Sequence, residues 1–174
     1  HSAGEKVADV LGKYIQLGKD DFLIVAAAGN YPEQEAANSS IFTIITDEVV
    51  KSHIIVVGNA RNGSPFRYYT QQCYGERIDV MAPGTDIYST VSLNEQDLYN
   101  QSGEKIYSAN QQFVSMTGTS MAAPHVTGLA ALVWAANPDL TGDQVKDIIV
   151  RTANIPVNGE DAEGYSHSMI NAAY

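Results

Sequence analysis

The sequence has one cysteine, few basic residues and no long apolar run, and each shortage excludes a class of protein. Cys73 is the only cysteine in 174 residues, which excludes an internal disulfide and a metal site built on paired thiolates. Lys and Arg number 10 against 20 Asp and Glu, and a net charge of −10 argues against nucleic-acid binding. His125, Thr127 and Gly128 interrupt the best apolar run before it reaches the roughly 18 residues of a membrane span. We therefore expect neither nucleic acid nor membrane as a partner.

Length and hydrophobicity indicate a single core. A chain of 174 residues with 44% hydrophobic residues can bury one good core, which predicts one domain or part of a larger one. The opening residues HSAGEKVADVL have no basic segment followed by an apolar one, so no signal peptide is visible in them. We therefore assign residues 1–174 to one domain.

Helical and strand patterns alternate along the chain. An i, i+3, i+4, i+7, i+8 spacing predicts a first helix ended by Gly18, with the apolar residues Val7, Val10, Leu11, Tyr14 and Ile15. Continuous apolar runs predict strands buried on both faces of a parallel sheet at 22–29 and 53–58, with two further strands at 77–84 and 112–118. A capping box of Thr141 and Gln144 predicts a last helix. This alternation indicates an α/β fold.

Polar connections separate these elements, at 30–40, 59–76 and 92–110. They are long enough to be functional loops. The apolar stretch 41–45 fits a strand or a helix equally well.

The segment 115–138, SMTGTSMAAPHVTGLAALVWAANP, combines a polar turn with a helix that is apolar on every side. Such a helix is expected to be buried, with Pro124 in its first turn and its end at Pro138. Ser120 then lies at the helix N-terminus, where free N–H groups and the helix dipole favour an anion. On helix physics alone, Thr119 or Ser120 could equally be an ordinary N-cap residue.

Four stretches resemble the subtilisin-like serine proteases, or subtilases, and the first three follow that family's order. VAAAGN (25–30) is similar to the oxyanion-hole segment, IDVMAPGTDIYST (78–90) to the Ala-Pro-Gly strand and turn, and GTSMAAPHVTG (118–128) to the nucleophile motif. YSHSMINAAY (165–174) resembles the closing helix region. The resemblance covers nearly the whole chain. It implies a three-layer α/β fold, with a mainly parallel sheet and helices on both faces, and a serine endopeptidase that acts on proteins or peptides.

The resemblance also assigns roles to residues. It makes Ser120 the nucleophile, with its own N–H and the side-chain amide of Asn30 as donors to the oxyanion, and it gives Thr119 a supporting place. Acyl transfer requires this combination of an attacking hydroxyl and donors for the developing negative oxygen. One wall of the pocket for the residue before the cleaved bond is implied at Ala27, Ala28 and Gly29. Without the motif, Asn30 reads as a turn residue after Gly29.

The base that a serine nucleophile needs is missing. Subtilases carry the triad Asp in an Asp-Thr/Ser-Gly strand and the His in a His-Gly-Thr-His helix, and neither motif occurs here. His125 lies five residues beyond Ser120, which turns it by roughly 140° and advances it about 7.5 Å along the helix. We therefore expect His125 to be a structural core histidine and Asp79 to be structural as well.

These absences lead to an expectation about the whole protein. We expect residues 1–174 to be the C-terminal portion of a subtilisin-like domain, truncated on its N-terminal side. Its partner is then the missing Asp- and His-bearing half. Alone, the chain is expected to be inactive and to self-associate.

Two other functions are compatible with an α/β fold. A non-catalytic pseudoprotease that serves as a binding module is the alternative function, whereas a nucleotide-binding domain lacks its G-x-G-x-x-G or G-x-x-x-x-G-K-[ST] motif. The resemblance suggests bacterial, extracellular use. Calcium is common in the family, but the sequence shows no run of oxygen ligands, so no metal or cofactor site is assigned.

Overall fold

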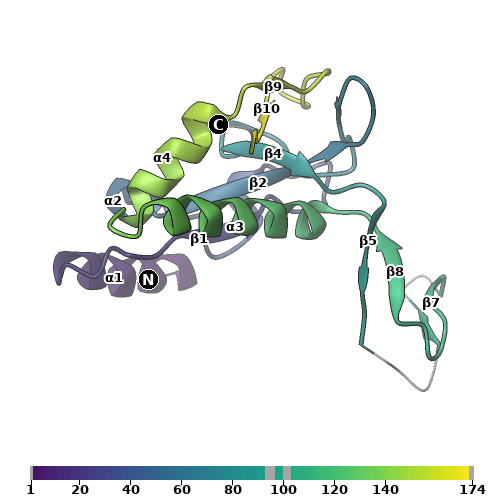
Figure 1. The fold of residues 1–174 in the computed structure, drawn as a ribbon, viewed down its shortest axis with the longest axis horizontal. Helices are drawn as coiled ribbons and strands as arrows, with labels where there is room; N and C mark the ends of the chain where they lie inside the picture. The colour runs from purple at the N-terminus through teal and green to yellow at the C-terminus, as the bar shows by residue number, and fades with distance from the viewer. Residues whose placement is uncertain (1, 93–96, 100–102, 173–174) are drawn as a thin grey trace.

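A computed structural model describes residues 2–92, 97–99 and 103–172 and shows a mainly parallel sheet (Figure 1). The strand order is β1-β2-β4-β10-β9, and β3 pairs with β2 outside this path. The pairs β1–β2, β2–β4 and β4–β10 are parallel, whereas β9 and β3 run antiparallel to their partners. The strands are β1 (Ile24–Ala27), β2 (Ile54–Arg61), β3 (Arg67–Tyr68), β4 (Val80–Pro83), β9 (Ile155–Pro156) and β10 (Ser168–Met169).

Helices cover both faces of this sheet, so the molecule has three layers. Because side chains alternate along β2, Ile54 and Val56 meet one layer while Ile55 and Val57 meet the other. The first layer holds α1 (Ala3–Gln16) and α2 (Glu48–Lys51), and the second holds α3 (Thr119–Ala136) and α4 (Gly142–Thr152). The predicted three-layer α/β fold is confirmed.

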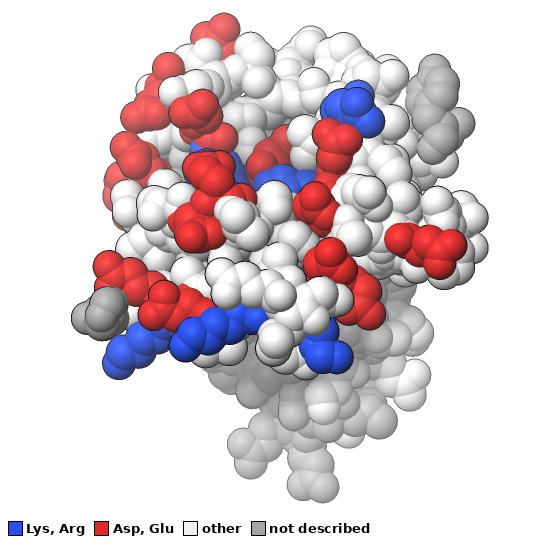
Figure 2. All heavy atoms as spheres, turned by 90° about the vertical axis from the view of Figure 1, so that its left-hand side faces the viewer, with Lys and Arg blue, Asp and Glu red and all other residues white. Residues whose placement is uncertain are grey.

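The surface is acidic, as the composition requires. Figure 2 shows Asp and Glu side chains spread over the side of the molecule on which α1, α2 and α4 lie in Figure 1, around a hollow with Lys and Arg on its floor. In the part of the chain that the structure describes, no helix is long and apolar enough to cross a membrane.

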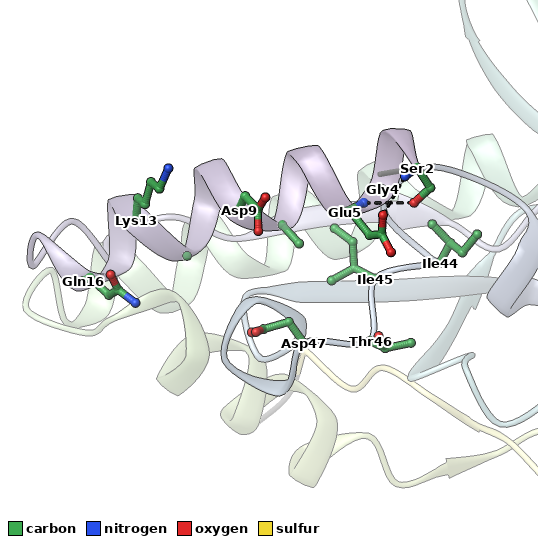
Figure 3. A pocket seen from close by; sticks show the side chains of 12 residues that line it. Ser2, Gly4, Glu5, Asp9, Lys13, Gln16, Ile44, Ile45, Thr46 and Asp47 are labelled. Carbon is green, nitrogen blue, oxygen red and sulfur yellow. Dashed lines mark hydrogen bonds between the residues drawn. The ribbon is translucent and has the colours of Figure 1, made fainter.

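The first helix starts where the sequence predicts, at a capping box. The Glu5 N–H donates to Ser2 Oγ at 3.2 Å, and the Ser2 N–H donates to Glu5 Oε2 at 2.6 Å (Figure 3). A further backbone turn closes the helix at Gly18, whose φ of +72° suits glycine.

Only three of the five apolar residues predicted for the buried face of α1 pack on the core. Val7, Leu11 and Ile15 pack on the core, whereas Val10 and Tyr14 are 63% and 52% exposed. A 3.6-residue period drifts around the helix, so the two outer positions of a wide stripe turn away from a flat sheet.

The predicted strands in the main sheet are confirmed, with one difference in burial. β2 is fully buried up to Ala60, but β1 keeps partial exposure at all but Ala26. β1 is the edge of the sheet order and pairs only with β2 among the described strands. An edge position therefore explains why a continuous apolar run is not buried on both faces.

The predicted strand at 112–118 exists but lies outside the main sheet. It forms β8 (Phe113–Met116), which pairs antiparallel with β5 (Ile87–Thr90) in a two-stranded ribbon that projects from the body (Figure 1). Only Val114 is buried in β8, which is the pattern of a one-sided ribbon. The expectation of a fourth buried parallel strand there is wrong.

All three predicted connections contain some regular structure, and 59–76 includes the end of β2 and the whole of β3. Within 92–110, β6 (Leu98–Tyr99) and β7 (Lys105–Tyr107) form a hairpin, while 93–96 and 100–102 lie outside the described residues. The undecided stretch 41–45 forms turns, because Ser40 and Thr43 exchange side-chain and backbone hydrogen bonds there. The loop 30–40 contains one short 3-10 helix, η1 (Ala36–Asn38).

The helix α3 corrects three expectations. Its N-cap is Gly118, so neither Thr119 nor Ser120 caps it, and Pro124 is its sixth residue, beyond the first turn. The third correction concerns burial. Ala122, Val126 and Ala130 face the sheet, but the opposite side is open, and Leu132 is 66% exposed. An all-apolar helix is thus only half covered by the described residues.

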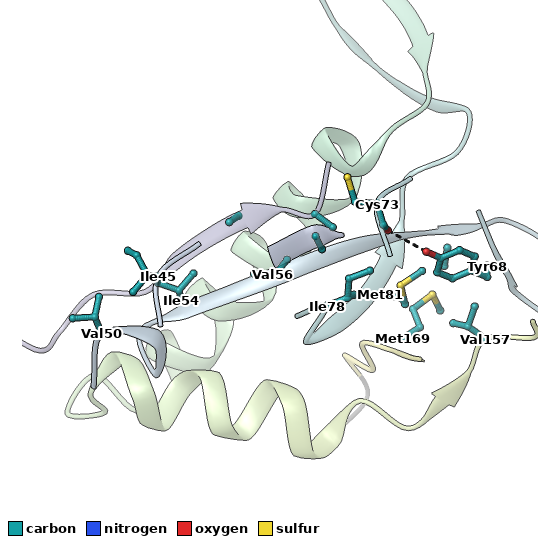
Figure 4. Close-up of a cluster of buried hydrophobic side chains, with 14 residues drawn as sticks. Ile45, Val50, Ile54, Val56, Tyr68, Cys73, Ile78, Met81, Val157 and Met169 are labelled. Atoms are coloured by element: carbon teal, nitrogen blue, oxygen red, sulfur yellow. Dashed lines mark hydrogen bonds between the residues drawn. The ribbon is translucent and has the colours of Figure 1, made fainter. Parts of the chain in front are cut away.

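The last helix and the buried core agree with the sequence. α4 begins at the predicted Thr141–Gln144 capping box, and Val145 and Ile149 are buried against the sheet. Figure 4 shows the cluster on the opposite face, with Ile54 at one end, Val56 in the middle, and Met81 and Met169 at the other end.

The open side of α3 predicts self-association of the 174-residue chain. Leu132→Glu is expected to lower the average mass measured by light scattering, because apolar surface is lost and a charge is added. Leu17→Glu is the matched control, since Leu17 is 75% exposed but follows α1 across the sheet. A monodisperse monomer at high concentration before any substitution would contradict the prediction.

Candidate active site

Ser120 is exposed and is the second residue of α3, directly after a close approach of two glycines. The Gly118 N–H donates to the Gly84 carbonyl at 2.8 Å, which ties the start of α3 to the end of β4. A Cβ at Gly84 would lie 2.7 Å from the Gly118 oxygen and 2.7 Å from Asn59 Oδ1. Glycine at 84 is therefore required for the helix N-terminus to lie here.

Asn30 follows β1 and lies against the same helix N-terminus. Its Oδ1 accepts from the Thr119 N–H at 2.9 Å and from Thr119 Oγ1 at 3.1 Å. Two donors on one atom identify that atom as the oxygen, so Nδ2 is directed elsewhere. A Cβ at Gly118 would lie 3.3 Å from Nδ2, which places this donor beside the residue that leads into Ser120.

Thr119 connects the two segments from a fully buried position. Besides donating to Asn30, its Oγ1 accepts from the Gly29 N–H at 3.1 Å. Since that N–H occupies a lone pair, the hydroxyl hydrogen is free to point at Asn30. The side chain therefore orients the Asn30 amide rather than capping α3.

The predicted pocket wall is only partly exposed. Ala28 has no exposed surface and belongs to the core, so its side chain cannot contact a substrate, and that assignment is wrong. Successive side chains of a strand point to opposite faces, which buries Ala28 and turns Ala27 the other way. Ala27 and Gly29 are half-buried.

Cys73 supports Gly29 from behind. The Cys73 N–H donates to the Gly29 carbonyl at 3.0 Å, and a Cβ at Gly29 would lie 2.6 Å from the Cys73 sulfur. Gly29 also has a φ of +104°. Both the positive φ and the lack of space for a Cβ therefore require glycine at this position. Burial raises the pKa of the Cys73 thiol, which favours the neutral thiol in this packed position.

A buried carboxylate holds the turn after Cys73. Asp161 Oδ2 accepts from the Gly75 N–H at 2.7 Å and lies 3.1 Å from His167 Nε2. Burial raises the pKa of Asp161, but hydrogen bonds from the N–H groups of Gly75, Tyr165 and Glu163 and from His167 outweigh it, and the net pKa is lowered. No local sequence pattern predicts this contact, because Asp161 and Gly75 are 86 positions apart.

A cavity of about 450 Å³ lies beside Ser120, between α3 and the β5–β8 ribbon. Its lining includes Val114, Met116, Met121 and His125. His125 is exposed and its Nδ1 lies 3.0 Å from the Met121 carbonyl, so the expected core histidine is instead a surface residue. Its position four residues after Met121 brings the ring back over that carbonyl.

No described residue is placed against Ser120 as a base would be. Among residues 2–92, 97–99 and 103–172, no histidine or carboxylate hydrogen-bonds to it, and no three His, Cys, Asp or Glu side chains group to hold a metal. Asp79 accepts from Arg77 at 2.9 Å and from the Val56 N–H at 2.7 Å, and pairs with Lys146 at 3.1 Å. These contacts give Asp79 the structural place that its sequence context predicts.

Comparisons with known proteins agree with this arrangement. The subtilase family model matches residues 2–169. An extracellular serine protease of Serratia marcescens is 33% identical over 138 residues, which are 75% of this chain and 13% of that protein. Subtilisin DY of Bacillus licheniformis is 32% identical over 149 residues, 86% of this chain and 44% of that protein.

Solved structures extend the likeness to the fold. The crystal structure of a cold-adapted subtilisin-like serine proteinase matches with a TM-score of 0.59 and 26% identity, over 87% of this chain and 45% of that one. This chain belongs to the subtilase family of serine peptidases. It spans less than half the length of each of these three proteins.

The Thr119 hydroxyl is expected to stabilise the fold as well as the site. Thr119→Val leaves the half-buried Gly29 N–H without its acceptor, which costs about 1 kcal/mol. Chemical denaturation of the chain measures the loss. Thr127→Val is the control, because Thr127 lies exposed on the same helix and bonds only to the Ala123 carbonyl. Equal losses of unfolding free energy in the two variants would show that the Thr119 hydrogen bonds add no stability beyond that of an exposed threonine.

Proposed function

We propose that this chain carries the nucleophile and oxyanion hole of a serine endopeptidase that hydrolyses peptide bonds through an acyl-enzyme on Ser120. The observation that supports it is the fixed orientation of Asn30. Thr119 holds Oδ1 with two hydrogen bonds, which leaves Nδ2 as a donor beside the N-terminus of α3. Membership in the subtilase family supports the same assignment.

The chemistry follows from the position of Ser120. Its Oγ attacks the scissile carbonyl, and the carbonyl oxygen becomes negative in the tetrahedral intermediate. The Ser120 N–H belongs to the first turn of α3, whose N–H groups have no acceptor within the helix. Together with Asn30 Nδ2 it forms a pair of donors for that oxygen, and the helix dipole adds to the stabilisation. The amine leaves when the intermediate collapses, and water then hydrolyses the ester.

The proton of Ser120 has to go to a base outside the described residues. We propose that the Asp and His of the triad belong to another part of the same catalytic domain, so that residues 1–174 form its C-terminal portion. Small or half-buried groups at Ala27 and Gly29 leave room for a substrate side chain. The alternative is a pseudoprotease that uses the same cleft only for binding.

The proposed setting is extracellular and bacterial. Relatives are described as an extracellular serine protease from Serratia marcescens and an extracellular basic protease from Dichelobacter nodosus. Protein or peptide substrates are proposed on the strength of the family.

The chain alone is expected to react poorly with a fluorophosphonate. Without a base, Ser120 keeps its proton and attacks slowly, so labelling at Ser120 should be negligible over a time that fully labels a complete subtilase. Mass spectrometry of the labelled chain, with Ser120→Ala as the blank, gives the result. Rapid stoichiometric labelling would show that a base exists within these residues.

Asn30 is tested in a catalytic domain that supplies the Asp and His. Asn30→Leu removes one oxyanion donor, so kcat should fall about a hundredfold to a thousandfold with KM nearly unchanged. This reference loss, about 2.7 to 4 kcal/mol, comes from subtilisin itself and not from the present structure.

A second substitution separates catalysis from folding. Asn30→Leu also removes the acceptor for Thr119, so it lowers stability, whereas Asn30→Asp keeps the acceptor and loses only the donor. Asn30→Asp should therefore unfold close to the wild type while its kcat falls at least as far. An unchanged kcat in Asn30→Asp would leave Asn30 as the turn residue of the alternative reading.

A further inference from the structure

A cleft of about 550 Å³ lies away from Ser120, between α2, the turns at 43–46 and the approach to β4. Four exposed glutamates line it, and the hollow with a basic floor is visible in Figure 2. They are Glu35, Glu48, Glu76 and Glu163. Its volume falls within the range of small-molecule sites, about 300–1,000 Å³.

Arg77 lines this cleft with an unused hydrogen-bonding edge. Its side chain is 8% exposed and its Nη1 donates to Asp79 at 2.9 Å. Nε and Nη2 are buried and have no partner among the described residues. These two N–H groups lie on one edge of the guanidinium and match the two oxygens of a carboxylate. Buried donors of this kind are rarely left unpaired, so the edge calls for an acceptor.

Asp79 cannot supply that acceptor, because its oxygens already take the Val56 N–H, Arg77 and Lys146. Arg77 and Lys146 against Asp79 leave one net positive charge at this floor. Above it, Glu48 pairs with Lys51 of the same lining at 3.2 Å, and the other three glutamates repel a simple anion. A ligand that satisfies both regions therefore carries a carboxylate and, a few atoms away, a cation. Tyr74 and Tyr165 also line the cleft, and aromatic side chains attract a cation.

We propose that this cleft binds arginine through its α-carboxylate, either as the free amino acid or as the C-terminal residue of a peptide. The carboxylate pairs with Nε and Nη2 of Arg77, and the ligand guanidinium meets the glutamates. Because both nitrogens are buried in this structure, a side chain of the cleft moves aside when the ligand enters. The proposal is independent of the hydrolysis proposed for Ser120.

Calorimetric titration of the 174-residue chain with small probes tests the proposal. N-acetyl-Gly-Arg as the free acid is expected to bind, while its C-terminal amide and N-acetyl-Gly-Leu acid bind at least tenfold more weakly, and acetate does not bind. Free arginine distinguishes the two sources: binding as tight as the peptide acid assigns the site to the amino acid, and weaker binding assigns it to peptide C-termini.

Substitutions locate the binding. Arg77→Lys keeps a charge for Asp79 but lacks the two-nitrogen edge, so it should bind the acid at least tenfold more weakly, and Arg77→Met should do the same. Arg151→Met is the matched control, since Arg151 is 73% exposed on α4 and pairs with Asp147. Glu163→Gln should weaken binding of the peptide acid a few-fold, and Ser120→Ala should leave its affinity unchanged.

The outcomes are decisive even where a variant fails to fold. If Arg77→Met is unfolded, Arg77→Lys and the comparison of acid with amide still answer the question. Equal binding of acid and amide, wild-type affinity in Arg77→Lys, or no binding of the acid at millimolar concentration would overturn the proposal, and the edge of Arg77 would then be closed by a glutamate of the cleft.

Discussion

Two hydrogen bonds from Thr119 to Asn30 Oδ1 join the end of β1 to the start of α3, across 89 positions of sequence. The rest of the candidate site depends on this contact. It requires Gly84 and Gly118 to approach closely on one side and Gly29 to adopt a positive φ on the other. Each of these glycines is explained by the space that the contact leaves, and not by flexibility.

The contact also explains why the support of the site is spread along the chain. The Gly29 carbonyl accepts a hydrogen bond from the Cys73 N–H, and the Gly75 N–H in the turn after Cys73 donates to Asp161 near the end of the chain. Tyr68 reinforces the same turn through a hydrogen bond to the Cys73 carbonyl at 3.1 Å (Figure 4). A donor placed for a developing charge needs such rigidity, because reorganisation at the moment of reaction would reduce its effect.

The sequence predicts the positions of Ser120 and Asn30 relative to their helix and strand, because Asn30 follows one continuous apolar run and Ser120 precedes another. It does not predict the hydrogen bonds of Thr119 or of Asp161, since those depend on partners 86 to 90 positions away. The placement of β8 fails for a related reason: four residues carry too little pattern to choose between a main sheet and a ribbon. The apolar composition of α3 indicates that both of its sides are covered in the complete protein, but it does not indicate which element covers the side away from the sheet.

Asp79, Asp161 and the described histidines already have hydrogen-bond partners in this structure. The half-buried carboxylate of Asp79 and the buried carboxylate of Asp161 accept from backbone N–H groups and lie against cationic side chains or His167, and freeing either would leave those donors unpaired. His167 is paired with Asp161, and His53 is buried with its Nδ1 near Ser52 and the Val49 carbonyl. His125 alone lines the cavity beside Ser120, but its Nδ1 is turned back to its own helix. The packing that orients the Asn30 amide therefore leaves Ser120 without a hydrogen-bonded base among the described residues, which is why the proposed hydrolysis draws its base from another part of the domain.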